Sequence, residues 1–514
     1  MVLKILLLVI FFAVTVGVGI YCRKNATDVS GFVLGGRSVG PWLTAFAYGT
    51  SYFSAVIFIG YAGQFGWKYG IASTWIGIGN AVLGSLLAWV ILGRRTRIMT
   101  QTLGSATMPE FFEKRYNSKP LKVVASAITF VFLIPYTASL YNGLSRLFES
   151  AFGIDYAYCV VAMSILTGIY VIAGGYMATA INDFIQGIIM LIGIVAVIGA
   201  VLGSHGGFIG SLTELTKVAV PETAGPITEA GTFASMFGPD PVNLLGVVIL
   251  TSLGTWGLPQ MVQKFYAIKS EKSIKRGTLI STFFAVIVAG GCYFLGGFAR
   301  ISGVTVQPGT DVPVGGYDAV IPTMLEGLPT LLIAIVIVLV LSASMSTLSS
   351  LVLTSSSTLT LDFIKGTFVK DMKEKKQLLI MRIFIVVFIV LSAVIAIFQV
   401  KAKSDAVAFI AQLMGVSWGA LAGAFLAPFL YGLYAKWASK AATWACMIFG
   451  AGIMIANLLF RSSFPVLLQS PINCGAFAML AGLIIFPVVS LITKKPDKAV
   501  VEHAFTGVSE RLDD

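Results

Sequence analysis

One stretch near the middle of the chain limits what this sequence can fold into. Between Glu326 and Asp362 there is no Lys, Arg, Asp or Glu, yet twelve of the nineteen residues from Ser342 to Thr360 are Ser or Thr. An uncharged apolar segment of this length predicts a helix that spans a membrane. Because hydrocarbon offers hydroxyls no water, they must face protein, a cavity or a ligand. A dense set of small neutral oxygens in a membrane suits an alkali cation, so a sodium site is the leading hypothesis.

The composition of the whole chain agrees with this reading. Of 514 residues, 57% are hydrophobic and 11% are charged, whereas a soluble domain averages about 25% charged residues. We therefore predict an all-α polytopic membrane protein with about thirteen transmembrane helices, each near the roughly 20 residues that a spanning helix needs. The apolar segments are centred near Val9, Ser54, Leu83, Thr129, Ile165, Leu191, Val248, Ala285, Val338, Val387, Gly419, Ile448 and Leu483.

The net charge of +12 does not indicate a nucleic-acid partner, because the basic residues lie in short loops between apolar segments. Thirteen spans put the two termini on opposite sides. With the N-terminus outside, 27 of the 35 Lys and Arg residues are cytoplasmic, including the run from Lys264 to Arg276. The positive-inside rule therefore predicts an outside N-terminus and a cytoplasmic C-terminus, in a multi-pass protein of the plasma membrane, namely a bacterial inner membrane. The first apolar run, about 17 residues, exceeds a signal-peptide core and predicts an uncleaved span.

Two of the predicted spans contain residues that would interrupt a helix. The second span includes small and polar residues, with a break expected near Ser51–Ser54. The seventh has two glycines and a proline within the six residues Gly254–Pro259. Either feature alone could be a simple kink. Because the two lie five spans apart, however, they indicate the midplane binding site of a transporter built from two halves.

A serine face and one acidic residue are further candidates for function. Ser346, Ser349 and Ser350 share one face of the ninth span through their i+3 and i+4 spacing. Such a face also serves helix packing, but this run is denser than packing requires. Asp183 stands at the start of the sixth span, where an ionisable residue either marks a functional site or caps the helix. The aspartate and the serine face can meet only if the sixth and ninth spans pack together.

Five segments of the chain together resemble the sodium/solute symporter family, and its proline and pantothenate branches most of all. These segments read YFSAVIFIG, SRLFESAFGIDY, YVIAGGYMATAINDFIQG, LPQMVQKFYAIKS and SMSTLSSLVLTSSSTLTLDFIK. The resemblance covers roughly residues 31–431. It implies a fold of the leucine-transporter type, with a first helix in residues 1–30 and inverted five-helix repeats in 42–205 and 240–431. Two C-terminal helices in 438–493 and a cytoplasmic tail in 494–514 would complete it.

The resemblance also implies where the ligands bind. A first sodium site would use the carbonyls of Thr50, Phe53 and Ala343 with the hydroxyls of Ser346 and Thr347. Some relatives hold a second sodium ion, and the corresponding positions here are Asp183, Ser346, Ser349 and Ser350. The proline branch has an aspartate where this chain has Tyr52 and a tryptophan where it has Thr251, so the solute pocket is expected to be neutral and aromatic. Its expected lining is Ser54, Ile57, Tyr136, Tyr141, Thr255, Trp256, Pro259 and Gln260.

These features predict a sodium-coupled secondary active symporter that imports a small organic solute by alternating access. The solute would be an amino acid such as proline or a small carboxylate such as pantothenate. Na+ is the expected co-transported ion, and the other partners are the solute and the lipid bilayer, without an organic cofactor, nucleic acid or required protein. The alternatives are a channel, which would need a filter or charged ring, and a transporter-like sensor, for whose signalling domain the tail is too short. Enzyme activity is not expected, because the two histidines, His205 and His503, lie in predicted loops or tails.

Overall fold

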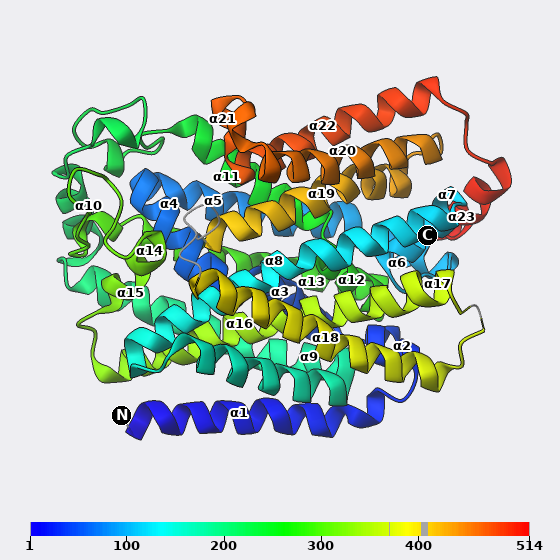
Figure 1. Cartoon of the computed structure of the whole chain (residues 1–514), viewed down its shortest axis with the longest axis horizontal. Helices are drawn as coiled ribbons and strands as arrows, with labels where there is room; N and C mark the ends of the chain where they lie inside the picture. Colours follow the sequence, from blue (N-terminus) through cyan, green and yellow to red (C-terminus); the bar gives the residue numbers. More distant parts are fainter. Residues whose placement is uncertain (1, 370, 402–409, 513–514) are drawn as a thin grey trace.

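The computed structural model describes residues 2–369, 371–401 and 410–512. Within these residues the secondary structure is helical, with no β-strand. Eleven of the described helices are long and apolar enough to cross a membrane. Figure 1 shows that most long helices run along the same axis of the molecule, so that their ends gather at two opposite faces. The prediction of an all-α polytopic membrane protein is confirmed.

Two of these eleven helices are too long for one crossing. The first, Val56–Thr102, has 47 residues, and α9 (Tyr156–Gly203) has 48. At 1.5 Å per residue each would extend about 70 Å, more than twice the roughly 30 Å of the hydrocarbon core. Each is interrupted by a glycine in a conformation that L side chains avoid: Gly70 (φ 61°, ψ −143°) and Gly175 (φ 53°, ψ −144°). Counted as two passes each, they raise the eleven described helices to the thirteen predicted spans.

The remaining bounds follow the hydropathy pattern closely. The spans comprise α1 (Val2–Cys22), α3 (Pro41–Tyr52) with α4 (Ala62–Tyr69), α5 (Thr74–Gly79) to α6 (Arg94–Thr102), α8 (Lys119–Phe152), both halves of α9, α11 (Pro241–Leu253) with α12 (Pro259–Ala267), α13 (Glu271–Ala285) with α14 (Gly291–Gly296), α16 (Thr330–Thr358), α18 (Glu374–Lys401), α19 (Ile410–Tyr434), α20 (Lys440–Leu459) and α22 (Pro471–Ile492). The shorter helices are α2 (Val29–Leu34), α7 (Met108–Tyr116), α10 (Gly207–Thr216), α15 (Val320–Leu325), α17 (Lys365–Thr367), α21 (Val466–Gln469) and α23 (Lys498–Leu512).

Both predicted breaks interrupt their helices. In the second span α3 ends at Tyr52, Phe53 is extended (φ −81°, ψ 117°), and a π-helical segment, η3 (Val56–Tyr61), leads into α4. In the seventh span α11 is followed by one 3-10 turn, Leu258 is extended (φ −84°, ψ 120°), and α12 starts at Pro259. Proline lacks a backbone N–H, but at the first position of a helix that N–H would have no partner within the helix, so no hydrogen bond is lost. The two breaks therefore share nearly the same backbone conformation.

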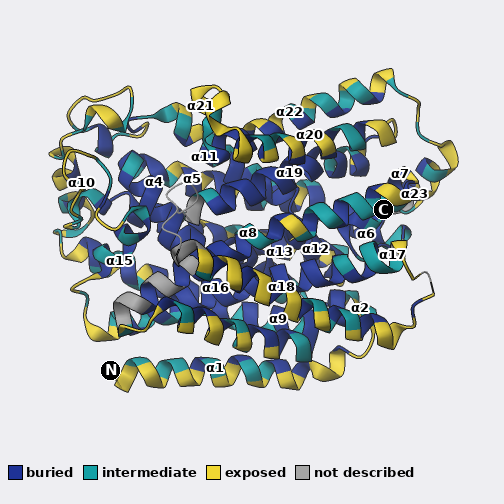
Figure 2. Cartoon of the chain, in the orientation of Figure 1, coloured by how far each residue is buried: buried dark blue, intermediate teal, exposed yellow. Residues whose placement is uncertain are grey.

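Helix α16 carries the hydroxyl-rich stretch and lies in the interior, packed against α3, α8, α9 and α18. All twelve Ser and Thr residues between Ser342 and Thr360 are buried. Large apolar side chains instead cover the outside, as on Ile192, Leu279 and Ile484, which are 64%, 72% and 67% exposed. Figure 2 shows the same contrast between a buried centre and exposed outer helices such as α1 and α22. Lipid can cover this apolar surface, whereas the hydroxyls face protein.

The two ends of the described chain lie at opposite faces of the helix assembly. In Figure 1 the N-terminal end of α1 lies on the same side as α10, α15 and α21. The C-terminal helix α23 lies at the other side, together with α6, α7 and α17. This arrangement agrees with an odd number of crossings.

Candidate functional site

The break in the second span faces the hydroxyls of α16. The Ser346 Oγ lies 3.2 Å from the carbonyl oxygen of Thr50 and 3.1 Å from that of Ala343. The Thr347 Oγ1 lies 3.1 Å from the Thr50 oxygen, 3.3 Å from the Phe53 oxygen and 3.1 Å from the Ala343 oxygen. The structure thus brings together all five groups that were predicted for a first sodium site.

Within this group of five oxygens, hydrogen-bond acceptors outnumber the hydroxyl hydrogens that can be donated. Ser346 and Thr347 have one hydroxyl hydrogen each, while they make five close contacts with three carbonyl oxygens. Each hydroxyl hydrogen can form one good hydrogen bond at a time, so several of the oxygen lone pairs lie close together without a hydrogen between them. The carbonyls of Thr50 and Phe53 are available because the regular i to i−4 bonding stops where α3 ends. A small cation would satisfy this cluster better than the two hydrogens do.

One turn further along α16 lie the serines that were expected for a second sodium site. The Ser350 Oγ is 2.8 Å from the Ser51 Oγ and also accepts a hydrogen bond of 3.0 Å from the Nζ of Lys264. The Ser349 Oγ donates to the Ser346 carbonyl of its own helix, at 2.9 Å. Among the four residues expected for the second ion, one hydroxyl is therefore already bound to an ammonium group and another to backbone.

Asp183 is fully buried in α9, and neither of its carboxylate oxygens has a hydrogen-bond partner in the described chain. It does not cap a helix, because it lies two turns beyond the Gly175 kink and inside α9. Helix α9 packs against α16, which meets the condition under which the aspartate and the serine face can approach one another. Lys264 interacts electrostatically with Asp183.

Lys264 is buried inside the helix assembly. The predicted topology places Lys264 in a basic cytoplasmic segment; in the structure the residue belongs to α12, within the candidate span Pro241–Ala267, and is only 2% exposed. Its ammonium also lies 5.2 Å from the centre of the Tyr176 ring. The break before Pro259 starts α12 afresh, and all nine residues of this helix, Lys264 among them, are buried.

Several residues predicted for the solute pocket are buried and carry unused hydrogen-bonding groups. The Ser54 hydroxyl, the Tyr136 hydroxyl and both polar atoms of the Gln260 amide make no hydrogen bond of normal geometry within the described chain. Tyr136 interacts with Ser54, which follows directly after the break in the second span. Buried polar groups are nearly always paired, so this group of orphaned atoms indicates a ligand.

Two aromatic residues that the pocket prediction did not include lie next to Tyr136. The Trp418 ring, on α19, lies 5.9 Å from the Tyr136 ring and 5.8 Å from the Tyr52 ring, measured between ring centres. The Trp418 Nε1 and the Tyr52 hydroxyl are also buried and make no hydrogen bond of normal geometry in the described chain. Gly254, in the break of the seventh span, provides the space for Trp418, because a Cβ there would lie 2.8 Å from the indole ring. A single tryptophan in an apolar span gives no sequence signal for this role.

Other predicted pocket residues bond to protein. The Thr255 Oγ1 donates to the carbonyls of Gly84 (3.1 Å) or Ser252 (2.9 Å), and the Trp256 Nε1 donates to the Leu83 carbonyl (2.9 Å). The Tyr141 hydroxyl accepts a bond of 2.9 Å from Ser164. Ile57 is buried in η3, and Pro259 begins α12. Thr255 and Trp256 thus connect the break of the seventh span to the π-helical segment η5 (Asn80–Leu87) of the third span.

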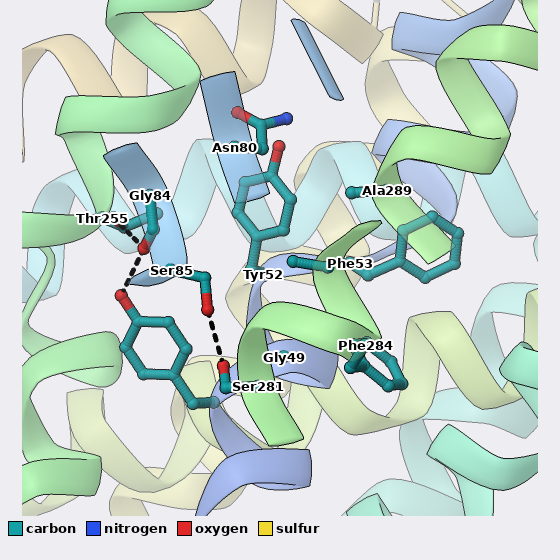
Figure 3. Close-up of a pocket in the computed structure, with 12 residues that line it drawn as sticks. Gly49, Tyr52, Phe53, Asn80, Gly84, Ser85, Thr255, Ser281, Phe284 and Ala289 are labelled. Atoms are coloured by element: carbon teal, nitrogen blue, oxygen red, sulfur yellow. Dashed lines mark hydrogen bonds between the residues drawn. The ribbon is translucent and has the colours of Figure 1, made fainter. Parts of the chain in front are cut away.

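A narrow cavity lies beside the break of α3. Figure 3 shows the Tyr52 hydroxyl pointing toward Asn80, and the hydrogen bonds that join Ser85 to Ser281 and Thr255 to Gly84 around the same space. The Asn80 Oδ1 accepts from Ser252, while its Nδ2 has no partner in the described chain. This cavity is lined by residues of α3 and its break, of η5, of α13 and the π-helical segment Val286–Gly290 that follows it, and by Thr255 from the break of the seventh span. These residues are Tyr48, Gly49, Tyr52, Phe53, Asn80, Gly84, Ser85, Thr255, Ser281, Phe284, Ala285 and Ala289.

Comparison with known proteins places this geometry in context. The model of the sodium:solute symporter family matches residues 32–450. A sodium/proline symporter of Staphylococcus aureus strain JH9 is 29% identical over 514 residues, which cover 96% of this chain and 93% of that protein. The sodium/proline symporter of strain N315 is equally similar.

Solved structures resemble the fold. A substrate-bound, outward-open structure of a Na+-coupled sialic acid symporter superposes with a TM-score of 0.73 at 16% identity, covering 96% of this chain and 99% of that one. The inward-facing conformation of Mhp1 superposes with a TM-score of 0.50 at 15% identity, covering 91% and 94%. These likenesses confirm the predicted leucine-transporter type of fold.

Proposed function

The chain belongs to the sodium:solute symporter family, and from this premise we propose that it imports a small zwitterionic amino acid, with proline as the first candidate. Family membership makes it a sodium-coupled symporter and a multi-pass membrane transporter, not an enzyme.

The first sodium ion would bind between the α3 break and α16. The supporting observation is the cluster in which the hydroxyls of Ser346 and Thr347 meet the carbonyls of Thr50, Phe53 and Ala343. A cation there would join the broken helix to α16 and so favour the state in which both are aligned. Since each ligand favours the same state, sodium and solute should raise one another's affinity by the same factor.

The solute would bind next to the breaks, among Tyr52, Ser54, Tyr136, Gln260 and Trp418. None of these side chains is charged, and an unpaired charge in this interior would be costly. Tyrosine hydroxyls and the indole N–H, which is only a donor, suit a carboxylate. The amine of a zwitterion would be held by hydroxyl, amide and backbone oxygens, and the aromatic rings would contact a compact apolar ring such as that of proline.

A small carboxylate such as pantothenate is the second candidate. It is favoured by the surplus of donors at Trp418 and the tyrosines, and by the lack of a carboxylate at position 52, where Tyr52 stands. Proline is preferred because the relatives that are 29% identical over nearly the whole chain are sodium/proline symporters.

The test is uptake by purified protein in proteoliposomes under an inward sodium gradient. Labelled proline should accumulate above its external concentration and leave when the gradient is collapsed, while a potassium gradient alone should drive nothing. Pantothenate, sialic acid and short monocarboxylates serve as competitors in the same assay. Proline that neither accumulates nor competes with any transported solute would refute the proposed substrate, and sodium-independent uptake would refute the coupling.

The orientation with an outside N-terminus is also proposed. It is supported by the position of α6, α7, α17 and α23 at one face (Figure 1), since the basic segments of the sequence lie in or beside these helices. A protease site appended after residue 514 should be cut in inside-out vesicles and protected in intact cells.

A further inference from the structure

Lys264 is a buried lysine that the transport scheme above does not use. It is 2% exposed, on α12, the second half of the broken seventh span. Its Nζ donates to the Ser350 hydroxyl at 3.0 Å, and that hydroxyl is 2.8 Å from Ser51 at the break of α3. A buried ammonium is expensive unless charge and hydrogen bonds compensate it. Its location on the serine face of α16 therefore calls for an explanation.

The hydroxyl that holds Lys264 lies one helical turn from the proposed first sodium site. Ser346 and Ser350 are four residues apart, so they share a face of α16, about 6 Å apart along the axis. Ser346 contacts the Thr50 carbonyl and Ser350 contacts the Ser51 hydroxyl, both on the last turn of α3. The ammonium thus binds a hydroxyl that itself links α16 to the last turn of α3, one helical turn from the first site.

The local charge permits one cation there, not two. Asp183 is buried, has no hydrogen-bond partner in the described chain, and interacts electrostatically with Lys264. One carboxylate and one ammonium sum to zero. A sodium ion bound to Asp183 and Ser350 in addition would leave one uncompensated positive charge in the interior, a few ångströms from an ammonium on the same hydroxyl.

We propose that the Lys264 ammonium is a tethered cation that takes the place of a second sodium ion, so that the chain binds a single sodium ion, at the first site. This proposal rests on the proposed sodium coupling and specifies its stoichiometry. Asp183 and Ser350 then serve to hold the lysine, and the aspartate compensates its charge without contact to a metal. If Lys264 only tied α12 to α16, its removal would lower stability but leave the number of bound sodium ions unchanged.

Equilibrium binding of 22Na+ to the purified full-length protein tests the proposal without any solute. The wild type should bind one sodium ion per chain. Lys264→Met, which keeps the apolar stem and removes the charge, should bind two, because Asp183 and Ser350 become free to hold an ion. The double variant Asp183→Asn/Lys264→Met should return to one. Lys275→Ala, which removes an exposed lysine on α13, is the matched control and should also bind one.

Two bound ions in the wild type would overturn the proposal whatever the variants do, so it stays falsifiable if Lys264→Met fails to fold. One bound ion in a folded Lys264→Met protein would overturn it equally. Neither result would affect the proposed sodium coupling. Wild type that binds no sodium at all would instead refute the first site and the coupling, and the tethered-cation proposal with them.

Discussion

Replacing Thr347 by alanine should weaken sodium activation far more than it alters solute selectivity. The substitution deletes the Oγ1 atom that lies 3.1 to 3.3 Å from the carbonyl oxygens of Thr50, Phe53 and Ala343. It leaves those carbonyls and the Ser346 hydroxyl in place. The buried aromatic residues of the solute pocket do not depend on this hydroxyl.

The size of the effect follows from the loss of one ligand out of five. An interaction between a neutral polar group and a charge contributes about 1.5–3 kcal/mol. Each 1.4 kcal/mol is a factor of ten in an equilibrium constant, so the sodium concentration for half-maximal uptake should rise about 10- to 100-fold. The lost methyl group adds roughly 1 kcal/mol of destabilisation, which lowers the amount of folded protein and not its sodium affinity.

The assay is initial uptake as a function of sodium concentration, normalised to folded protein. Ser344→Ala is the matched control, because its hydroxyl is equally buried on α16 but donates to the Val340 carbonyl of its own helix. Thr347→Ser keeps the oxygen and should stay within about threefold of wild type. A sodium dependence of Thr347→Ala within twofold of the control would show that the ion does not bind here.

Three further predictions concern the charge pair and the pocket. Asp183→Asn should weaken sodium binding and lower thermal stability, since it leaves Lys264 as an unpaired buried charge, a change that costs about 3–5 kcal/mol; adding Lys264→Met should restore the melting temperature, and a fully stable single variant would contradict this. Tyr136→Ala should raise the apparent KM for the solute at least tenfold with a smaller change in sodium affinity, as measured by uptake kinetics; equal effects on both would contradict a pocket role. A diamine such as putrescine should fail to compete with a transported amino acid, because no acidic side chain was found among the pocket residues; effective competition would show that the pocket is misassigned.

Hydropathy was enough to predict the number of spanning helices, because every such helix must satisfy its backbone polar groups within itself, whereas the leucine-transporter type of fold was implied by the family resemblance. The thirteen passes are visible as thirteen apolar segments, and even the two helices that run through Gly70 and Gly175 divide where the predicted spans do. The five groups of the proposed first sodium site could also be named from the sequence, with the help of the family resemblance, and the structure brings them together. The oxygens of this site come from a local break and from two adjacent hydroxyl residues on one helix, and each of these two features depends on residues close in the chain.

Trp418 and Lys264 could not be assigned from the sequence, because their roles arise from contacts between distant segments. Trp418 lies among apolar residues of α19 and acquires its role only through Tyr52, Tyr136 and the missing side chain of Gly254. Lys264 lies in a stretch that ends in several lysines, where a cytoplasmic position is the ordinary expectation. Its burial depends on α12 packing against α3 and α16, a fact that no local pattern contains.

Charge balance connects the sodium cluster, the Asp183–Lys264 pair and the neutral pocket. On the proposed scheme the pair is neutral and the solute is a zwitterion, so one sodium ion is the net charge that each import cycle moves across the membrane. An interior-negative potential favours that movement by about 2.3 kcal/mol per 100 mV, which alone supports a roughly 50-fold accumulation. A second sodium ion at Asp183 would double this electrical contribution but would require two ions per solute. Because Lys264 supplies the second positive charge, each cycle needs one sodium ion instead of two. The electrical driving force per solute is then half of what two sodium ions would provide.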